Sequence, residues 1–141
     1  MQFRWSFAAS AFLASLVFGQ PTPEKYKTRL APVAMDASMR STIAGTGSAL
    51  ATLAGKTLTF SGTFEGLRSP ATVAKVHRGR ITGVRGPSIL DLNVSPAANG
   101  TIAGAVELTT DQLDDLRRGR LYIQIDSEKA PDGNLWGWLL K

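Results

Sequence analysis

The stretch Thr57-Leu-Thr-Phe-Ser-Gly-Thr-Phe64 alternates hydroxyl side chains with apolar residues. Because successive side chains of a β-strand point to opposite faces, the apolar residues should face a core and the hydroxyls should face solvent. Gly55-Lys56, directly before it, is typical of a hairpin turn, and residues 41–54, rich in Thr, Ala and Gly, supply a partner strand. The alternation therefore predicts an antiparallel hairpin.

Further short segments have the composition of strands and are separated by Gly, Pro and Asn. Strands at this spacing favour an antiparallel sandwich or barrel. We therefore expect an all-β, antiparallel, Greek-key-like sandwich or barrel with one short helix. The expected strands cover residues 26–30, 73–77, 88–94, 102–108, 121–126 and 135–140, with a tight turn between the last two.

The helix is predicted over about residues 109–118. Thr109 and Gln112 have the spacing of a capping box, in which each side chain accepts a hydrogen bond from the other residue's backbone N–H. Gly119 can adopt the left-handed conformation that ends a helix. The leucines of this segment are expected to face the core. The charged residues expected on its solvated face are Asp114, Asp115, Arg117 and Arg118.

Composition limits the chemistry. The chain has 141 residues, enough for one domain with a sizeable core. It has no cysteine, which excludes disulfides and thiol chemistry, and its single histidine, His77, excludes a multi-histidine metal site within one chain. The formal net charge of +5 favours anionic partners in a general way.

Residues 1–19 have the features of a signal peptide. Arg4 precedes an apolar run, and Val17-Phe-Gly19 fits a small-residue cleavage site after Gly19. A retained membrane anchor is the alternative, but the run is shorter than the roughly 20 residues that span a bilayer. We expect a secreted or periplasmic protein that does not span the membrane after cleavage. Its mature part would be a flexible leader, 20–25, and a single β domain, 26–141.

Several short motifs follow one another in the second half of the chain. In order they are Gly66-Leu-Arg-Ser-Pro-Ala71, Ala74-Lys-Val-His-Arg-Gly79, Leu108-Thr-Thr-Asp-Gln-Leu113, Leu116-Arg-Arg-Gly-Arg-Leu-Tyr-Ile-Gln-Ile-Asp126 and Pro131-Asp-Gly-Asn-Leu-Trp-Gly137. The ordered set resembles the CHRD domain, a module first named from chordin and common in exported bacterial proteins. The resemblance implies an exported β domain that binds another protein or a surface polymer.

The chain departs from the family at two of the three positions that usually carry histidine. It has Lys75 at the first and Asp126 at the last, and keeps only His77. In a typical member three histidines could approach one another, much as His-x-His strands hold copper and zinc in superoxide dismutase-like sandwiches. A protonated lysine has no lone pair for a metal, and one His with one Asp makes a poor site. We expect no metal and no cofactor, with a degenerate metal-binding sandwich of this type as the alternative.

Lys75 and His77 lie two residues apart on one expected strand, so their side chains face the same way. The resemblance implies that Asp126 lies on the neighbouring strand, where it would pair with Lys75 or accept a hydrogen bond from His77. We therefore predict a structural pair between Lys75 and Asp126.

A basic set occupies residues 75–85, which contain no acid. A mobile loop is predicted from Gly79, Gly83 and Gly86. The basic side chains of such a loop could bind an anionic surface polymer. No Phe, Tyr or Trp lies between Glu65 and Leu121, and this absence, with export, argues against nucleic acid as a partner. A solvated loop is the alternative.

Trp136 and Trp138 alternate on the last expected strand and therefore share a face. Trp136 stands where the family has arginine. We expect the two rings to pack in the core or at a dimer contact. The alternative is an exposed platform for sugar rings or a protein.

Catalytic signatures are absent from the sequence. It has no Gly-x-Ser-x-Gly motif and no glycine-rich phosphate loop, so any catalysis would depend on His77. We predict a non-enzymatic, exported binding or structural module that contacts an extracellular protein or an anionic surface polymer, and not nucleic acid. The candidate binding residues are Lys75, His77, Arg78, Arg80, Arg85, Trp136 and Trp138.

Overall fold

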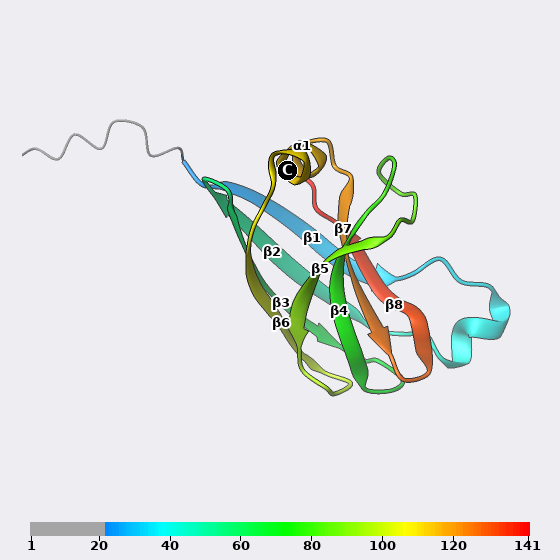
Figure 1. The fold of residues 1–141 in the computed structure, drawn as a ribbon. Helices are drawn as coiled ribbons and strands as arrows, with labels where there is room; N and C mark the ends of the chain where they lie inside the picture. Colours follow the sequence, from blue (N-terminus) through cyan, green and yellow to red (C-terminus); the bar gives the residue numbers. More distant parts are fainter. Residues whose placement is uncertain (1–21) are drawn as a thin grey trace, which may run out of the picture.

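The computed structural model describes residues 22–141, and eight of its segments are strands that close into an antiparallel barrel (Figure 1). Around the barrel the strands follow the order β1-β2-β3-β6-β5-β4-β7-β8. The all-β prediction is confirmed. Of the two predicted architectures, a sandwich or a barrel, the structure has the barrel. The predicted signal peptide, residues 1–19, lies outside the described residues. The strands are β1 (Glu24–Pro32), β2 (Thr46–Ala54), β3 (Thr57–Glu65), β4 (Ala71–Arg78), β5 (Ser88–Val94), β6 (Gly100–Glu107), β7 (Leu121–Ser127) and β8 (Ala130–Trp138).

Two connections that skip neighbouring strands, β3–β4 and β6–β7, produce the Greek-key-like order. β3 pairs with β6 and not with β4, and β4 pairs with β7 and β5. The β6–β7 connection holds the helix α1 (Thr110–Arg117), which covers one end of the barrel. A 3-10 helix, η1 (Ala37–Ser41), lies in the β1–β2 connection, on the side of the barrel formed by β8 (Figure 1).

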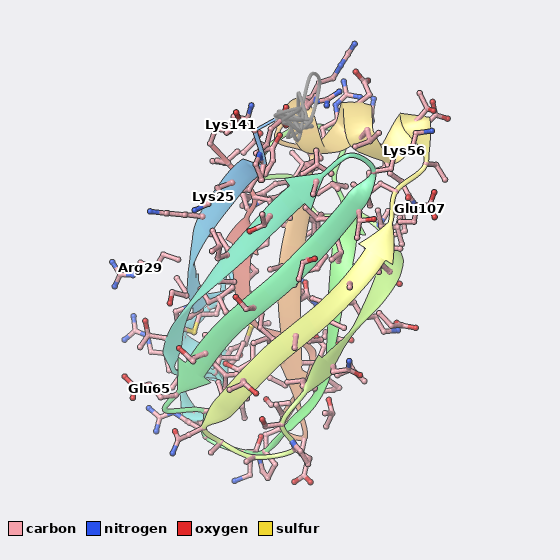
Figure 2. All side chains as sticks on the ribbon, turned by 90° about the vertical axis from the view of Figure 1, so that its left-hand side faces the viewer. Lys25, Arg29, Lys56, Glu65, Glu107 and Lys141 are labelled. Carbon is pink, nitrogen blue, oxygen red and sulfur yellow. The ribbon has the colours of Figure 1, made fainter. Side chains whose placement is uncertain are left out.

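Strand β3 has the predicted two faces. Leu58, Phe60 and Phe64 are buried, whereas Thr59 and Thr63 are exposed. The hairpin turn at residues 55–56 also forms as predicted. Figure 2 shows the outer side of β1, β2, β3 and β6, where the labelled charged side chains project outward from the ribbon.

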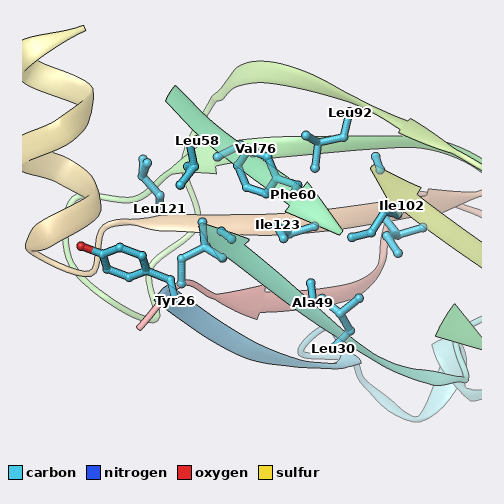
Figure 3. Close-up of a cluster of buried hydrophobic side chains, with 14 of the residues drawn as sticks. Tyr26, Leu30, Ala49, Leu58, Phe60, Val76, Leu92, Ile102, Leu121 and Ile123 are labelled. Atoms are coloured by element: carbon cyan, nitrogen blue, oxygen red, sulfur yellow. The ribbon is translucent and has the colours of Figure 1, made fainter. Parts of the chain in front are cut away.

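The core fills the barrel with apolar side chains from its strands and from α1. Each fully buried large apolar side chain contributes about 1.5–3 kcal/mol to stability. Figure 3 shows part of this cluster, with Tyr26 and Leu121 at the end next to the helix. Its largest fully buried members include Tyr26, Phe60, Leu30, Leu58, Ile102, Leu116, Leu121, Ile123, Ile125 and Leu135.

The helix forms within its predicted bounds because its N-terminal cap is complete. The Gln112 N–H donates to Thr109 Oγ1 at 3.2 Å, and the Thr109 N–H donates to Gln112 Oε1 at 3.0 Å. Gly119, just beyond the C-terminal end, has a φ of 69°. Leu113 and Leu116 are buried as expected.

One part of the helix prediction is wrong, because Asp115 does not face solvent. Only 5% of its side chain is exposed, and its two oxygens contact Arg78 Nε at 2.8 Å and Arg120 Nη1 at 3.6 Å. Two basic residues at barrel strand ends thus hold this face of α1 against the barrel. Asp114 does lie on the surface, in an ion pair with Arg118 at 2.9 Å.

Several strand boundaries differ from the sequence prediction, and two of the differences change the assignment of a segment. β1 begins at Glu24, two residues before the expected domain start, and the Tyr26 hydroxyl donates to Glu24 Oε2 at 2.8 Å. β8 begins at Ala130 and includes the segment expected to lie outside a strand, because the turn falls at residues 128–129 and Ser127 pairs with Ala130. Residues 22–141 contain no helix long and apolar enough to cross a bilayer.

Candidate binding site on the outer face of the barrel

The outer face of β4, β7 and β8 carries most of the side chains that the sequence singled out. The register places His77, Tyr122 and Trp138 in one row across the three strands. The next row holds Lys75, Gln124 and Trp136. The residues that alternate with these along the strands, such as Ile123 and Leu135, are buried in the core.

The aromatic side chains of this face form a continuous layer. The His77 ring stacks on Tyr122 with centroids 5.0 Å apart, and Tyr122 lies 4.4 Å from Trp138. Trp136 is in edge-to-face geometry with Tyr122 and with Trp138, at centroid distances of 5.6 and 5.8 Å. The two tryptophans thus share a face, but they form a layer outside the barrel and do not extend its main core. Trp136 also packs on a small cluster of Val33, Ile43 and Ala130.

The β4–β5 loop, residues 79–87, folds over this layer. The Gly86 N–H donates to Tyr122 Oη at 2.9 Å, and the Gly86 carbonyl accepts from the Tyr122 hydroxyl at 3.1 Å and from His77 Nδ1 at 2.9 Å. Because a carbonyl only accepts, His77 Nδ1 carries the proton of this hydrogen bond. The base of the loop, expected to be mobile, is tied to β4 and β7.

Glycine is required in this loop for a steric reason. A Cβ at Gly86 would overlap the carbonyl oxygen of Arg78, and one at Gly79 would lie 2.7 Å from the Trp138 ring. Gly79 and Gly86, taken as signs of a mobile loop, therefore allow its close approach to the barrel instead.

A pocket of about 450 Å³ opens between this loop and the start of β8. Its polar groups come from β4, β7, the loop and β8. The residues that line it are His77, Arg85, Gly86, Tyr122, Gln124, Asp126, Pro131 and Asp132.

Asp126 is the half-buried carboxylate of this pocket. One of its oxygens accepts a hydrogen bond from Gln124 Nε2 at 2.9 Å. Burial raises the pKa of Asp126 above its ordinary value, against the hydrogen bond from Gln124 and the nearby charges of His77 and Lys75, which lower it. Gln124 Nε2 also donates to the Asp132 carbonyl at 3.3 Å, which fixes the amide at the pocket floor.

The predicted pair between Lys75 and Asp126 does not form. Lys75 Nζ lies 3.8 Å from Asp91 Oδ1 on β5. The register explains the difference, since Lys75 stands opposite Gln124 on β7 and Asp126 stands opposite Val73. The offset of two residues along the strand moves Asp126 away from Lys75 and toward the start of β8.

The basic set is not brought together as one surface. Arg78 points to Asp115 at the helix end of the barrel. Arg85 reaches the opposite way, donating to the Asp132 carbonyl at 3.1 Å and lying 5.8 Å above the Trp136 ring. Arg80 is exposed and forms no ion pair within residues 22–141. Of the predicted binding residues, only His77 and Arg85 line the pocket.

Sequence reasoning missed Tyr122, Gln124 and Asp132 as pocket residues. Tyr122, Gln124 and Asp126 alternate along β7, so a signal for the first two was present in the residue spacing. Asp132 carried no such signal, because its segment was expected to lie outside a strand.

Within residues 22–141, no three His, Cys, Asp or Glu side chains lie close enough to hold a metal ion. Of the three positions that usually carry histidine, two hold side chains with metal-donor atoms, the His77 imidazole and the Asp126 carboxylate. The alternative of a degenerate metal-binding sandwich therefore has no support from the described side chains.

A family model described as CHRD domain matches residues 31–139. The chain belongs to the CHRD domain family. Comparison with curated proteins and with solved structures finds no match. In this CHRD domain, the three positions that usually carry histidine, here Lys75, His77 and Asp126, lie on the outer face of β4 and β7, and the last two line one pocket.

The outer face of this CHRD domain offers hydrogen-bonding groups of both charge signs on a rigid aromatic support. The pocket has donors in Arg85 and Gln124 and acceptors in the carboxylates of Asp126 and Asp132. Such an arrangement suits the recognition of a polar ligand.

Proposed function

We propose that this CHRD domain is an exported, non-catalytic binding module that contacts an extracellular protein through the outer face of β4, β7 and β8. CHRD domains occur in extracellular proteins, and residues 1–19 have the pattern of a signal peptide. Export predicts that protein recovered outside the cytoplasm begins at Gln20, which the intact mass tests.

The observation that supports binding is the pocket over Gln124 and Asp126. A half-buried carboxylate without an ion pair costs stability. Carboxylates in such positions are often part of a functional site. Asp126 accepts one hydrogen bond from Gln124 and has no ion-pair partner within 4 Å among residues 22–141. A ligand that donates to its free oxygen would compensate for the burial.

The test compares two variants as bait for extracytoplasmic proteins of the source organism. Gln124→Ala with Asp126→Asn removes the polar floor of the pocket. Thr59→Ala with Thr63→Ala is the matched control, because these exposed side chains lie on β3. A protein retained by the wild type and the control but released by the pocket variant supports the proposal. Equal retention by all three removes this pocket from consideration.

A second candidate partner is an anionic surface polymer. Arg80 and Arg85 are both exposed on the β4–β5 loop, and the whole chain is basic. Retention on an anionic matrix should then fall with salt and with Arg80→Ala and Arg85→Ala. Arg78 is left unchanged in this test, because its ion pair with Asp115 makes it part of the fold. Retention unaffected by both substitutions rules out the loop as a polymer site.

A further inference from the structure

A second cavity adjoins the pocket over Asp126. This cavity has a volume of about 190 Å³ and lies between the η1 segment and the start of β8. Arg85, Pro131 and Asp132 line both cavities. The contact between Arg85 and the Asp132 carbonyl stands at their shared wall. The two cavities are therefore adjacent compartments, and together we call them the groove.

Gly133 lies between the two compartments. Its φ is 130°, and a Cβ there would lie only 3.1 Å from Gln124 Nε2 and 3.2 Å from Val33 Cγ1, so this position is closely packed from both sides. Gln124 belongs to the polar compartment and Val33 to the second one. A larger side chain at this position would therefore crowd the wall between the two compartments, and a ligand that occupies both has to cross over that wall.

The second compartment is mostly apolar, although Thr42, Arg85, Lys129 and Asp132 also line it. Val33, Met39, Ile43 and Ala130 line it, and Met39 is 41% exposed at its rim. Methionine adapts its shape to different apolar partners. An aliphatic or aromatic side chain would be buried there.

The first compartment has the opposite charge to the protein as a whole. Two carboxylates, Asp126 and Asp132, line it against one guanidinium, Arg85. The nearby Lys75 is paired with Asp91. A cationic group is therefore complementary to this compartment, and a polyanion would meet two carboxylates.

We infer that the groove binds an extended segment of a partner protein that places an apolar side chain under η1 and a Lys or Arg side chain against Asp126. This inference rests on the proposed function and names the chemistry of the partner. An extended chain suits the groove because its neighbouring side chains point in opposite directions, one for each compartment.

Binding of synthetic peptides tests this chemistry. The probes are short labelled peptides that pair Leu with Lys, Arg, Gln or Glu, and fluorescence anisotropy measures their affinity for the intact domain. Peptides with Leu and Lys or Arg should bind best. Asp126→Asn should weaken these by about tenfold and leave the Gln peptides unchanged. Equal affinity for the Glu peptides, or a preference for Lys that survives Asp126→Asn, would overturn the inference.

A second variant tests the apolar compartment separately. Met39→Ser changes an exposed side chain, so the fold should be retained, and it should weaken every Leu peptide by about fivefold to tenfold. Thr59→Ala on β3 is the control and should change nothing. Undiminished binding by Met39→Ser contradicts the role of this compartment.

Two further outcomes separate the inference from the proposed function. If a natural protein partner is lost with the pocket variant while no peptide shows a charge preference, the proposed function stands and the inference fails. If sedimentation shows a dimer that Met39→Ser dissociates, or if heparin displaces the peptides by binding at Arg85, the groove belongs to a second copy or to a polyanion, and the inference also fails.

Discussion

Arg78 Nε lies 2.8 Å from Asp115 Oδ2, joining the end of β4 to the helix that covers the barrel. Residues 78 and 115 are far apart in sequence, and the aspartate is almost fully buried while the arginine is half-exposed. A charge in such a position needs its partner, because an unpaired buried carboxylate is strongly unfavourable.

We therefore predict that Arg78→Ala and Asp115→Ala each lower the free energy of unfolding by about 1–3 kcal/mol. The double variant should lose less than the sum of the two, which a double-mutant cycle in urea measures. The matched control is Asp114→Ala on the same helix. Its surface pair with Arg118 should contribute less than about 0.5 kcal/mol. Equal losses from both aspartates would contradict the buried role of Asp115.

Asp126→Asn should raise stability at neutral pH. Burial raises the pKa of Asp126 in the folded state, so the carboxyl group favours folding below its unfolded pKa, and this contribution is lost as pH rises through the folded pKa. The asparagine variant removes the cost of the buried charge. Urea unfolding at neutral and acidic pH should show a difference from the wild type that shrinks in acid. A variant less stable than the wild type at neutral pH would show that the carboxylate stabilises the fold.

Tyr26 should titrate far into the alkaline range. Burial, and then the hydrogen bond to Glu24, raise the pKa of Tyr26 from 10.0 to about 12. Because the folded-state pKa is the higher one, the stability due to Tyr26 is fully present below pH 10.0 and is lost as pH rises toward about 12. Tyrosinate absorbance should therefore contain a component with a midpoint near 12. Tyr26→Phe should abolish this component, and its persistence in that variant would refute the assignment.

Gly86→Ala should displace the β4–β5 loop from the barrel. The added Cβ overlaps the Arg78 carbonyl oxygen, and moving the loop breaks the hydrogen bonds to Tyr122 and His77. A loss of about 1–3 kcal/mol is expected, with a change in tryptophan fluorescence because the loop covers Trp138. Ile81→Ala in the same loop is the control, since its side chain is 61% exposed. Identical spectra for Gly86→Ala and the wild type would show that the loop is not held as described.

Purified protein should contain no stoichiometric copper or zinc. His77 Nδ1 is engaged by the Gly86 carbonyl, and residues 22–141 contain no group of three suitable ligands. Elemental analysis after purification without chelators measures this directly. One equivalent of metal that disappears in His77→Ala would restore the metal-binding alternative.

The elements that were predicted correctly depend on neighbouring residues. The alternation in β3 needs only the two-residue period of a strand, and α1 needs only its capping box and the glycine that follows it. The β8 boundary was missed because Pro131 and Gly133 are typical of turns, whereas here they lie in a strand next to a register shift in its pairing with β7.

The candidate site was predicted only in part. His77 and Asp126 were singled out, and both line the pocket. The basic residues could not be sorted by sequence, because Arg78 and Arg80 share a face by spacing yet only Arg78 reaches a buried carboxylate. That carboxylate belongs to a helix placed by long-range packing.

The amino-acid sequence by itself determined the β class, the position of the helix and the membership of the CHRD family, since these follow from local periodicity, capping and motif order. Only the tertiary structure decided that the strands close into a barrel, that Lys75 pairs with Asp91, and that Asp126 faces Gln124 and the start of β8. The reason is the register between strands distant in sequence, because a shift of two residues keeps every side chain on its face and still changes its partner.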